Sequence, residues 1–278
     1  HHSSTYQGTL GELRKQMTAS DVSRGVLLVY SRARERLEAE AARMPPGLSP
    51  EEKEAYQSRI RAAILADMER RNLWGCELSK HNPDISTFIA VDLAVQSAEE
   101  AARHARHMAD AHGARGIKLH TGLQGFSISD ERLWPLYRFC EQRGLSVLGH
   151  GGPDRNGNRF SEPEAFLAML QAFPRLTVVL AHMGGATWRQ TAAVAAKSPN
   201  LCFDCSEIIE WTGTPNGPSD AELAALIKEV GPERVMMGSD FPWYDLDHTI
   251  ARIMELPILT PAEKRGIMGE NAMRLLRL

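Results

Sequence analysis

Short apolar runs rich in β-branched residues alternate along the chain with longer stretches of helical periodicity. The apolar runs predict strands at Gly25–Ser31, Ser86–Leu93, Gly116–His120, Leu145–His150, Leu176–His182, Leu201–Ser206 and Arg234–Gly238. The other stretches predict helices at Leu10–Met17, Pro50–Arg71, Ser97–Ala111, Asp130–Arg143, Glu162–Phe173, Thr187–Lys197, Asp220–Val230 and Pro261–Arg277. Strands that are apolar on both faces and alternate with helices indicate a buried parallel sheet, so the pattern predicts an α/β fold.

Three of the predicted helices begin with recognisable N-terminal signals. Ser49 precedes Pro50 and two glutamates, which places Ser49 as the N-cap and Pro50 at the first helical position. Ser97 and Thr260 are each followed three residues later by Glu, the spacing of a capping box. These signals support the boundaries that the periodicity predicts.

The number and order of the strands favour a barrel. A (β/α)₈ TIM barrel has eight parallel strands and typically about 250 residues, and this chain has 278 residues. The chain opens on a short loop and a helix, so the strand that is absent from the pattern would be the first one, before His1. We therefore expect residues 1–278 to form a single TIM barrel whose first strand is missing or incomplete in this sequence.

Two connections that follow predicted strands are long. Residues 32–84 contain the charged run RARERLEAEAAR, which we interpret as a solvated helix face, and then the helix predicted at 50–71. Residues 151–161, GGPDRNGNRFS, are rich in Gly, Asn and Arg. Long βα connections of a barrel lie on its catalytic face, so we expect 32–84 to cover the active-site face.

Composition excludes some classes of function. With 43% apolar and 24% charged residues the chain is ordinary for a globular protein. Its net charge of −3 argues against a nucleic-acid or membrane-surface partner, and no apolar run approaches the length of a membrane span. Four cysteines without a secretory signal indicate a reducing cytoplasm. Cys202 and Cys205 lie in one predicted strand with their sulfurs on opposite faces, so we interpret them as structural thiols.

Polar side chains mark the ends of four predicted strands. Lys118 and His120 end one strand, His150 and His182 end the next two, and Asp240 follows the last. Because the carboxyl ends of barrel strands surround one mouth, we expect these side chains to converge. Two imidazoles and a carboxylate suit a divalent metal such as zinc, and a cation would offset the cost of burying a lone carboxylate. We therefore expect one divalent metal ion, with zinc as the first choice.

Four segments carry a resemblance to a known family. They are GIKLHTGLQGFSISDERLWPLYRFCEQRGLSVLGHGG, LAHMGGATW, VMMGSDFPW and the closing ENAMRLLRL. In this order they resemble the amidohydrolase superfamily, in the branch called amidohydrolase-related, and the likeness runs from about residue 10 to the end. The resemblance implies a metal-dependent (β/α)₈ barrel with a single metal.

The resemblance also implies roles for the strand-end residues. His150 would be a metal ligand, His182 would bind metal or polarise the substrate, and Asp240 would contact the metal and shuttle a proton from bound water. The family's first strand ends in an H-x-H pair of ligands, which is absent here, and this chain begins HHSS. Those histidines are either the end of a native motif, which makes His2 a candidate ligand, or the tail of an affinity tag.

Further residues are candidates for contacting the substrate. Lys118 or His120 would face an anionic group, although a lysine packed against the barrel wall is an equal alternative for Lys118. Arg155, in the glycine-rich connection, would clamp a carboxylate, and Trp188, after a strand end, would either wall the pocket or pack in the core. His104 and two other histidines of its predicted helix lack an accompanying carboxylate motif, and we interpret them as surface residues.

The sequence leaves three functions open. The main hypothesis is a metal-dependent hydrolase that cleaves a small ester, lactone or amide, because a metal lowers the pKa of its bound water to about 7. The alternative is a non-oxidative decarboxylase of an aromatic or muconate-type acid, since such enzymes share the branch that the chain resembles. A third hypothesis is an inactive barrel that binds a ligand. In each case we expect a small-molecule partner with an anionic group, and a homo-oligomer stays open.

Overall fold

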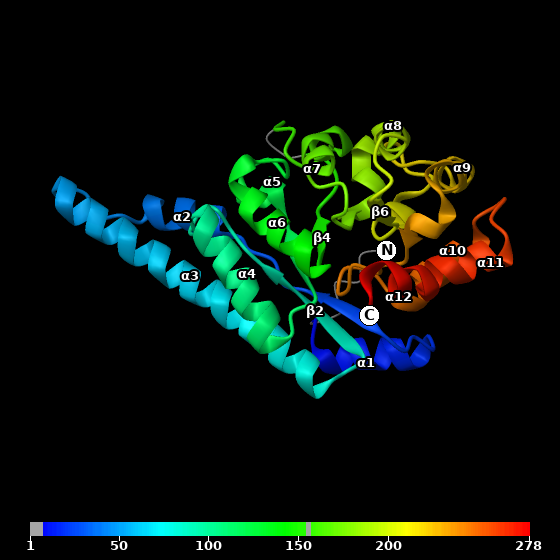
Figure 1. The fold of residues 1–278 in the computed structure, drawn as a ribbon, viewed down its shortest axis with the longest axis horizontal. Helices are drawn as coiled ribbons and strands as arrows, with labels where there is room; N and C mark the ends of the chain where they lie inside the picture. Colours follow the sequence, from blue (N-terminus) through cyan, green and yellow to red (C-terminus); the bar gives the residue numbers. More distant parts are fainter. Residues whose placement is uncertain (1–7, 154–156) are drawn as a thin grey trace.

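A computed structural model describes residues 8–153 and 157–278 of the chain. Its core is one sheet of seven parallel strands that pair in chain order and curl into a half-barrel with helices on the outside (Figure 1). The strands are β1 (Gly25–Leu28), β2 (Ile85–Ala90), β3 (Gly116–Leu119), β4 (Ser146–Gly149), β5 (Val178–Leu180), β6 (Leu201–Asp204) and β7 (Val235–Met236). All seven predicted strands are confirmed. Most end earlier than their apolar runs, since the polar tips lie beyond the ladders.

The two faces of the sheet pack against different clusters. Leu148, Val179 and Cys202 belong to a small cluster on the concave face, which also includes residues of the last helix. The neighbouring residues Val147 and Val178 belong to the large cluster between the sheet and the outer helices. Because side chains alternate along a strand, every second residue points into the half-barrel. The absence of an eighth strand, expected from the sequence, holds for the described residues, where β1 and β7 form the two edges.

Helices alternate with the strands, and most of them cover the convex face, while the last one contributes to the concave cluster. They are α1 (Leu10–Ala19), α2 (Ala33–Ala42), α3 (Pro50–His81), α4 (Ala98–His112), α5 (Thr121–Gln124), α6 (Trp134–Arg143), α7 (Leu167–Ala172), α8 (Thr191–Ala195), α9 (Asp220–Val230), α10 (Leu246–Glu255), α11 (Pro261–Arg265) and α12 (Asn271–Leu276). The capping boxes at Ser49, Ser97 and Thr260 are all present. Helix α10 was not predicted, because its apolar face is short, with Leu246 and Ile253 as its buried apolar residues.

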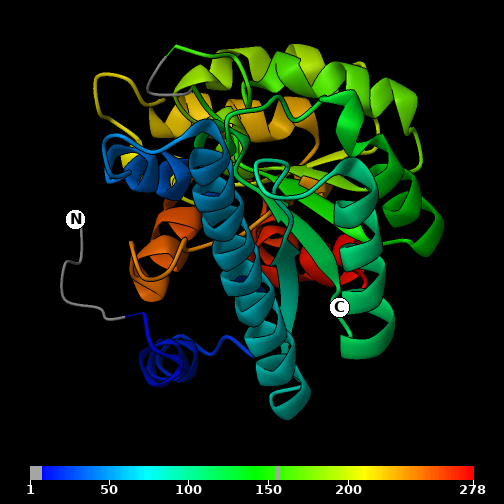
Figure 2. The same cartoon turned by 90° about the vertical axis from the view of Figure 1, so that its left-hand side faces the viewer.

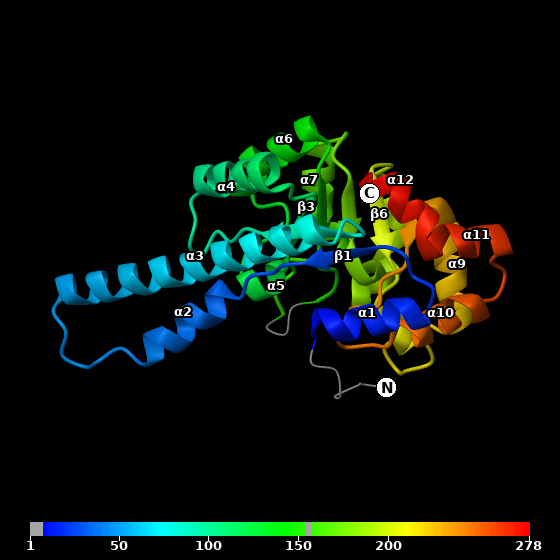
Figure 3. The same ribbon diagram turned by 90° about the horizontal axis from the view of Figure 1, so that it is seen from below.

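The long connection after β1 forms a helical hairpin. Its charged run is α2, which is largely exposed as expected and of whose residues only Ala33 is fully buried. Figures 1 and 3 show α2 and the first half of α3 projecting beyond the sheet, while the second half of α3 lies against β2. Helix α2 also contacts α5, the segment directly after His120. That residues 32–84 cover the active-site face stays a prediction.

The cysteines are free and buried within the described residues. Cys202 belongs to the concave cluster and Cys205 to the outer one, so the two sulfurs lie on opposite faces as the strand periodicity predicts. Burial raises the pKa of Cys202 to about 11 and that of Cys205 to about 12. In the described part of the chain, every helix is too short or too polar to cross a membrane.

A buried hydrogen-bond chain connects α3, β2 and α4, which lie side by side in Figure 2. The Asn72 side chain is oriented by two backbone bonds, because its Oδ1 accepts from Ala90 N (2.9 Å) and its Nδ2 donates to Ala90 O (2.8 Å). The same amide nitrogen lies 2.9 Å from His104 Nε2. Since the amide nitrogen can only donate, His104 Nε2 must accept.

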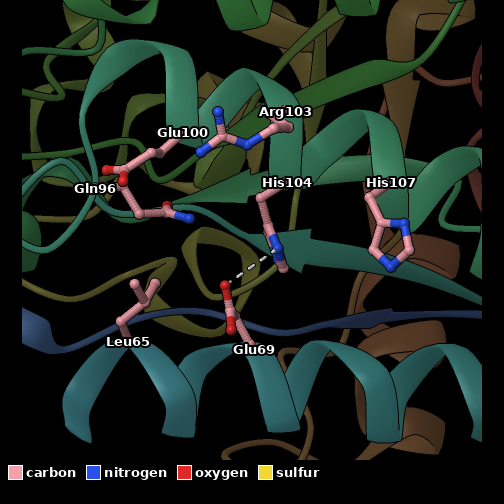
Figure 4. Close-up of a pocket in the computed structure, with 7 residues that line it drawn as sticks. All are labelled: Leu65, Glu69, Gln96, Glu100, Arg103, His104 and His107. Atoms are coloured by element: carbon pink, nitrogen blue, oxygen red, sulfur yellow. Dashed lines mark ion pairs between the residues drawn. The ribbon is translucent and has the colours of Figure 1, made fainter. Parts of the chain in front are cut away.

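His104 is therefore held neutral between the two helices. Its Nδ1 lies 3.7 Å from Glu69 Oε1, and Figure 4 shows the ring pointing from α4 toward that carboxylate. The imidazole is only 9% exposed. Burial, with smaller contributions from His107 and His112, lowers the pKa of His104 to about 4. The interpretation of this histidine as a surface residue is wrong, because its ring is buried between α4 and α3, where it contacts Asn72 and Glu69.

This arrangement predicts a pH-dependent stability. The folded pKa of His104 lies below the ordinary value of 6.5, so the unfolded chain binds more protons and stability falls as the pH falls. Between pH 7.5 and 5.0 the group should remove about 2 kcal/mol of unfolding free energy. Urea unfolding at both pH values should show that His104→Gln loses less stability on acidification than the unsubstituted chain.

The control for this prediction is His81→Gln, at the exposed end of α3. The control should lose as much stability between the two pH values as the unsubstituted chain. Equal losses in His104→Gln and in the control would refute the neutral, buried state of His104. Other histidines with lowered pKa values contribute equally to all three proteins and cancel in the comparison.

Candidate active site

Three histidines from neighbouring strands meet at the carboxyl ends of β3, β4 and β5. The rings of His120 and His150 stack, with centroids 3.8 Å apart and planes 15° apart. The rings of His150 and His182 meet edge to face at 4.9 Å, with His150 Nδ1 3.2 Å from His182 Nε2. The convergence predicted from the strand ends is therefore present for these residues, as the parallel register requires.

The backbone after β5 turns sharply to place His182. Both His182 and Met183 have left-handed backbone angles, with φ of 56° and 46°, and two glycines with positive φ follow. The neighbouring strand end approaches closely, since a Cβ on Gly151 would lie 2.1 Å from the carbonyl oxygen of Ala181. Glycines at these places allow the close approach and the sharp turn that larger residues would prevent.

The other edge of His182 contacts residues that follow β6. Its Nδ1 lies 2.9 Å from Ser206 Oγ and 3.1 Å from the Ser206 carbonyl oxygen. Asp204 Oδ1 accepts hydrogen bonds from the backbone N–H groups of His182 and Ser206, both at 3.1 Å, and from the Ser206 hydroxyl. The imidazole is thus fixed on one side by Ser206 and open toward His150 on the other.

One buried lysine lies within electrostatic reach of three carboxylates. Lys118, 6% exposed, lies at the end of β3, and burial lowers its pKa while Asp204, Asp240 and Glu207 oppose that shift. Burial raises the pKa of Asp240, against the attraction of His182 and Lys118. Burial likewise raises the pKa of Glu207, whose Oε2 lies 3.6 Å from His182 Nε2. The acids outnumber the lysine, so the group favours an additional cation.

His120 presents an unused nitrogen to this region. Burial is the main cause that lowers the pKa of His120 to about 3, with Lys118 and His182 adding to it. Burial, His120, His182 and Lys118 also hold the pKa of His150 well below its usual range. Within the described residues, His120 Nδ1 is buried without a hydrogen-bond partner. Both rings are therefore neutral and able to accept a hydrogen bond or bind a ligand.

Not every predicted residue joins this cluster. Trp188 is 7% exposed and belongs to the main hydrophobic cluster, with the Arg189 guanidinium 4.2 Å from its ring centroid. Its position corresponds to the packing alternative for this residue. His2 and Arg155 lie outside the described residues, and their roles stay predictions.

The prediction from sequence missed Asp204, Ser206 and Glu207. Asp204 follows Cys202 by two residues, so strand alternation places it on the concave face at the end of β6. That position is a signal that a search of strand ends could have used. Ser206 and Glu207 lie in the following loop, where Glu207 has a positive φ of 61°, and no regular spacing indicates where a loop side chain points.

The donor set at this mouth has the chemistry of a metal site but is incomplete. Among residues 8–153 and 157–278, no three His, Cys, Asp or Glu side chains are gathered closely enough to hold an ion. Imidazole nitrogens and carboxylate oxygens are the donors that divalent cations bind, and the buried His120 Nδ1, which has no partner among the described residues, is such a donor left unused. Imidazoles and nearby carboxylates therefore fit a divalent cation, provided that further ligands complete the site.

Comparison with known proteins supports the family resemblance that the sequence motifs indicated. A family model described as amidohydrolase matches residues 32–278. Among curated proteins, the 2-amino-3-carboxymuconate-6-semialdehyde decarboxylase of Dictyostelium discoideum is 24% identical over 215 residues, or 67% of this chain. The matched part is 60% of that relative, so this chain spans less than two thirds of its length.

Solved structures share the fold at low identity. A TIM-barrel protein of unknown function from Bordetella bronchiseptica has a TM-score of 0.71 and 22% identity, covering 97% of this chain and 83% of its own. A 5-carboxyvanillate decarboxylase from Novosphingobium aromaticivorans, complexed with manganese and 4-hydroxy-3-methoxy-5-nitrobenzoic acid, has a TM-score of 0.68 and 14% identity, covering 99% and 85%. The predicted fold and family are thus confirmed: the chain belongs to the amidohydrolase family and shares the TIM-barrel fold.

Proposed function

We propose that this protein is a metal-dependent, non-oxidative decarboxylase of a small aromatic or unsaturated carboxylic acid. The observation that carries the proposal is the buried group at the strand ends, where three imidazoles are in contact and three carboxylates act electrostatically on Lys118. The decarboxylase activities of the curated relative and of one solved structure support this choice over hydrolysis. This reverses the order of the two functions that the sequence alone favoured.

His150 and Asp240 are the residues that would hold the metal. His150 Nδ1 lies 3.2 Å from His182 Nε2, and Asp240 is close enough to His182 and Lys118 to feel their charges. A bound divalent cation would supply positive charge that keeps the buried Asp240 carboxylate ionised and attracts the substrate's oxygen atoms. The sequence favoured zinc, whereas manganese is bound in the related decarboxylase structure, so either ion is a reasonable first trial.

Lys118 and His120 would receive the acidic substrate. The ammonium group of Lys118 is buried, and an anion that replaces water beside it would gain a strong charge-assisted contact. His120 offers a buried nitrogen that has no partner among the described residues. Together they would orient the carboxylate that is lost, while the stacked His150 ring limits how far His120 can turn.

His182 would deliver the proton that replaces carbon dioxide on the substrate carbon. Loss of carbon dioxide leaves the electron pair of the broken C–C bond on that carbon, which must then take up a proton. The Nε2 atom of His182 faces the cluster, and the residue is only 5% exposed. To do so the ring must first be protonated on both nitrogens, and the Glu207 carboxyl, whose Oε2 lies 3.6 Å from Nε2 and whose pKa burial raises, would supply that proton. The ring then acts as a shielded general acid.

Hydrolysis remains the second candidate, because the same site could activate water. In that reaction Asp240 would accept the proton of the attacking water and pass it to the leaving group. The buried position of Asp240, which raises its pKa, suits a residue that takes up and releases a proton. The products distinguish the two reactions.

One prediction of the proposed function concerns its products. The full chain, loaded with manganese or zinc, should release carbon dioxide from a panel of acids that includes 5-carboxyvanillate and 2-amino-3-carboxymuconate-6-semialdehyde. Carbon dioxide is measured by a coupled assay, and a matched panel of esters, lactones and amides is tested for new carboxylate. Turnover of the second panel alone would refute decarboxylation, and metal binding without turnover of either panel would favour a binding barrel.

Another prediction concerns the proposed metal ligand on the β7 side. Asp240→Asn should lower the bound metal, measured by elemental analysis after dialysis, and reduce kcat at least about 100-fold. Asp247→Asn, at an exposed acid in α10, is the matched control and should leave both quantities unchanged. Full metal content in Asp240→Asn would show that this carboxylate is not a ligand.

A further inference from the structure

The hydrogen position on His182 can be deduced from its contacts. Its Nδ1 lies 3.1 Å from the carbonyl oxygen of Ser206, and a carbonyl oxygen can only accept a hydrogen bond. Nδ1 must therefore carry the hydrogen in this contact. A neutral imidazole has only one ring hydrogen, so the neutral ring held in this way has an unprotonated Nε2.

The hydroxyl group of Ser206 is directed by Asp204. Its single hydrogen is donated to Asp204 Oδ1, so the hydroxyl oxygen is free to accept from His182 Nδ1 at 2.9 Å. Asp204 is itself anchored, because the same oxygen also accepts from the backbone N–H groups of Ser206 and His182. With 8% exposure, Asp204 is shielded from water that would compete for these bonds.

The backbone at His182 makes such an anchor necessary. His182 and Met183 both have left-handed backbone angles, and two glycines with positive φ follow them. Non-glycine residues adopt these angles only where surrounding contacts hold them. The bond from the His182 backbone N–H to Asp204 and the bonds from its ring to Ser206 fix the same residue at both ends.

We infer that Ser206 and Asp204 are positioning residues that hold His182 with its hydrogen on Nδ1 and present Nε2 to the reacting region. Nε2 lies 3.2 Å from His150 Nδ1 and 3.6 Å from Glu207 Oε2, on the side of the ring away from Ser206. The inference rests on the proposed function in that His182 is taken to act on the substrate. A ring that delivers a proton from Nε2 is left in the form that Ser206 binds.

The test begins with the tautomer, which needs no substrate. The full chain labelled with ¹⁵N-histidine and loaded with zinc should show a protonated Nδ1 and an unprotonated Nε2 for His182, with His182→Gln used to assign the signals. Ser206→Ala should weaken this preference, and Asp204→Asn should change the pattern in the same direction. A wild-type ring with its hydrogen on Nε2 would overturn the inference.

Kinetics then separate positioning from a general structural effect. Ser206→Ala should lower kcat for carbon dioxide release roughly 10- to 100-fold, the usual cost of losing an outer partner of a site histidine, with little change in KM. Ser206→Thr keeps the hydroxyl and should retain most of kcat. Ser146→Ala, at a buried serine on β4, controls for the loss of a buried hydroxyl and should leave kcat unchanged.

The outcomes distinguish this inference from the proposed function. If the tautomer is as expected but no acid of the panel is decarboxylated, the proposed reaction is wrong and the positioning role stands. If carbon dioxide is released but Ser206→Ala changes neither the nitrogen signals of His182 nor kcat, the positioning role is wrong and the proposed reaction stands.

Discussion

The parallel order of the sheet is the constraint on which the site depends. Seven strands pair in chain order and in one direction, so all of their carboxyl ends lie along one rim of the half-barrel. Alternation of side chains then sends every second residue toward the concave face. Lys118 and Asp204 occupy such positions near the ends of β3 and β6, where they pair in register with Leu148 and Met236 of the concave cluster. Residues more than 80 positions apart in the sequence are neighbours for this reason.

Burial of opposite charges gives this rim its chemical character. A lone lysine or carboxylate would lose its charge on leaving water, and the directions of the pKa shifts at Lys118, Asp240 and Glu207 all reflect that cost. The groups partly compensate one another, yet the acids remain in excess. A divalent cation would complete the compensation, and the same charge would attract an acidic substrate. The metal and the substrate class of the proposed reaction thus follow from one electrostatic imbalance.

Prediction from the sequence succeeded for residues whose side-chain direction is fixed by a regular strand. The apolar runs located all seven strands, and the strand ends identified His120, His150 and His182, which the structure brings into contact. The prediction of site residues was less complete for side chains that lie in loops. Ser206 and Glu207 reach His182 from an irregular segment, and no periodicity constrains such side chains. His104 was misjudged because its burial depends on α3, whose Asn72 lies 32 residues earlier in the sequence.

The sequence by itself therefore determined the α/β architecture, the helix starts, the family resemblance and the strand-end histidines, because these depend on local periodicity and on motifs of consecutive residues. Only the tertiary structure decided which nitrogen of His182 meets Ser206, which acids act electrostatically on Lys118, and that Trp188 packs in the core. Those features depend on distances between side chains of different strands and loops. Such distances arise only when the sheet curls and brings its separate βα connections together.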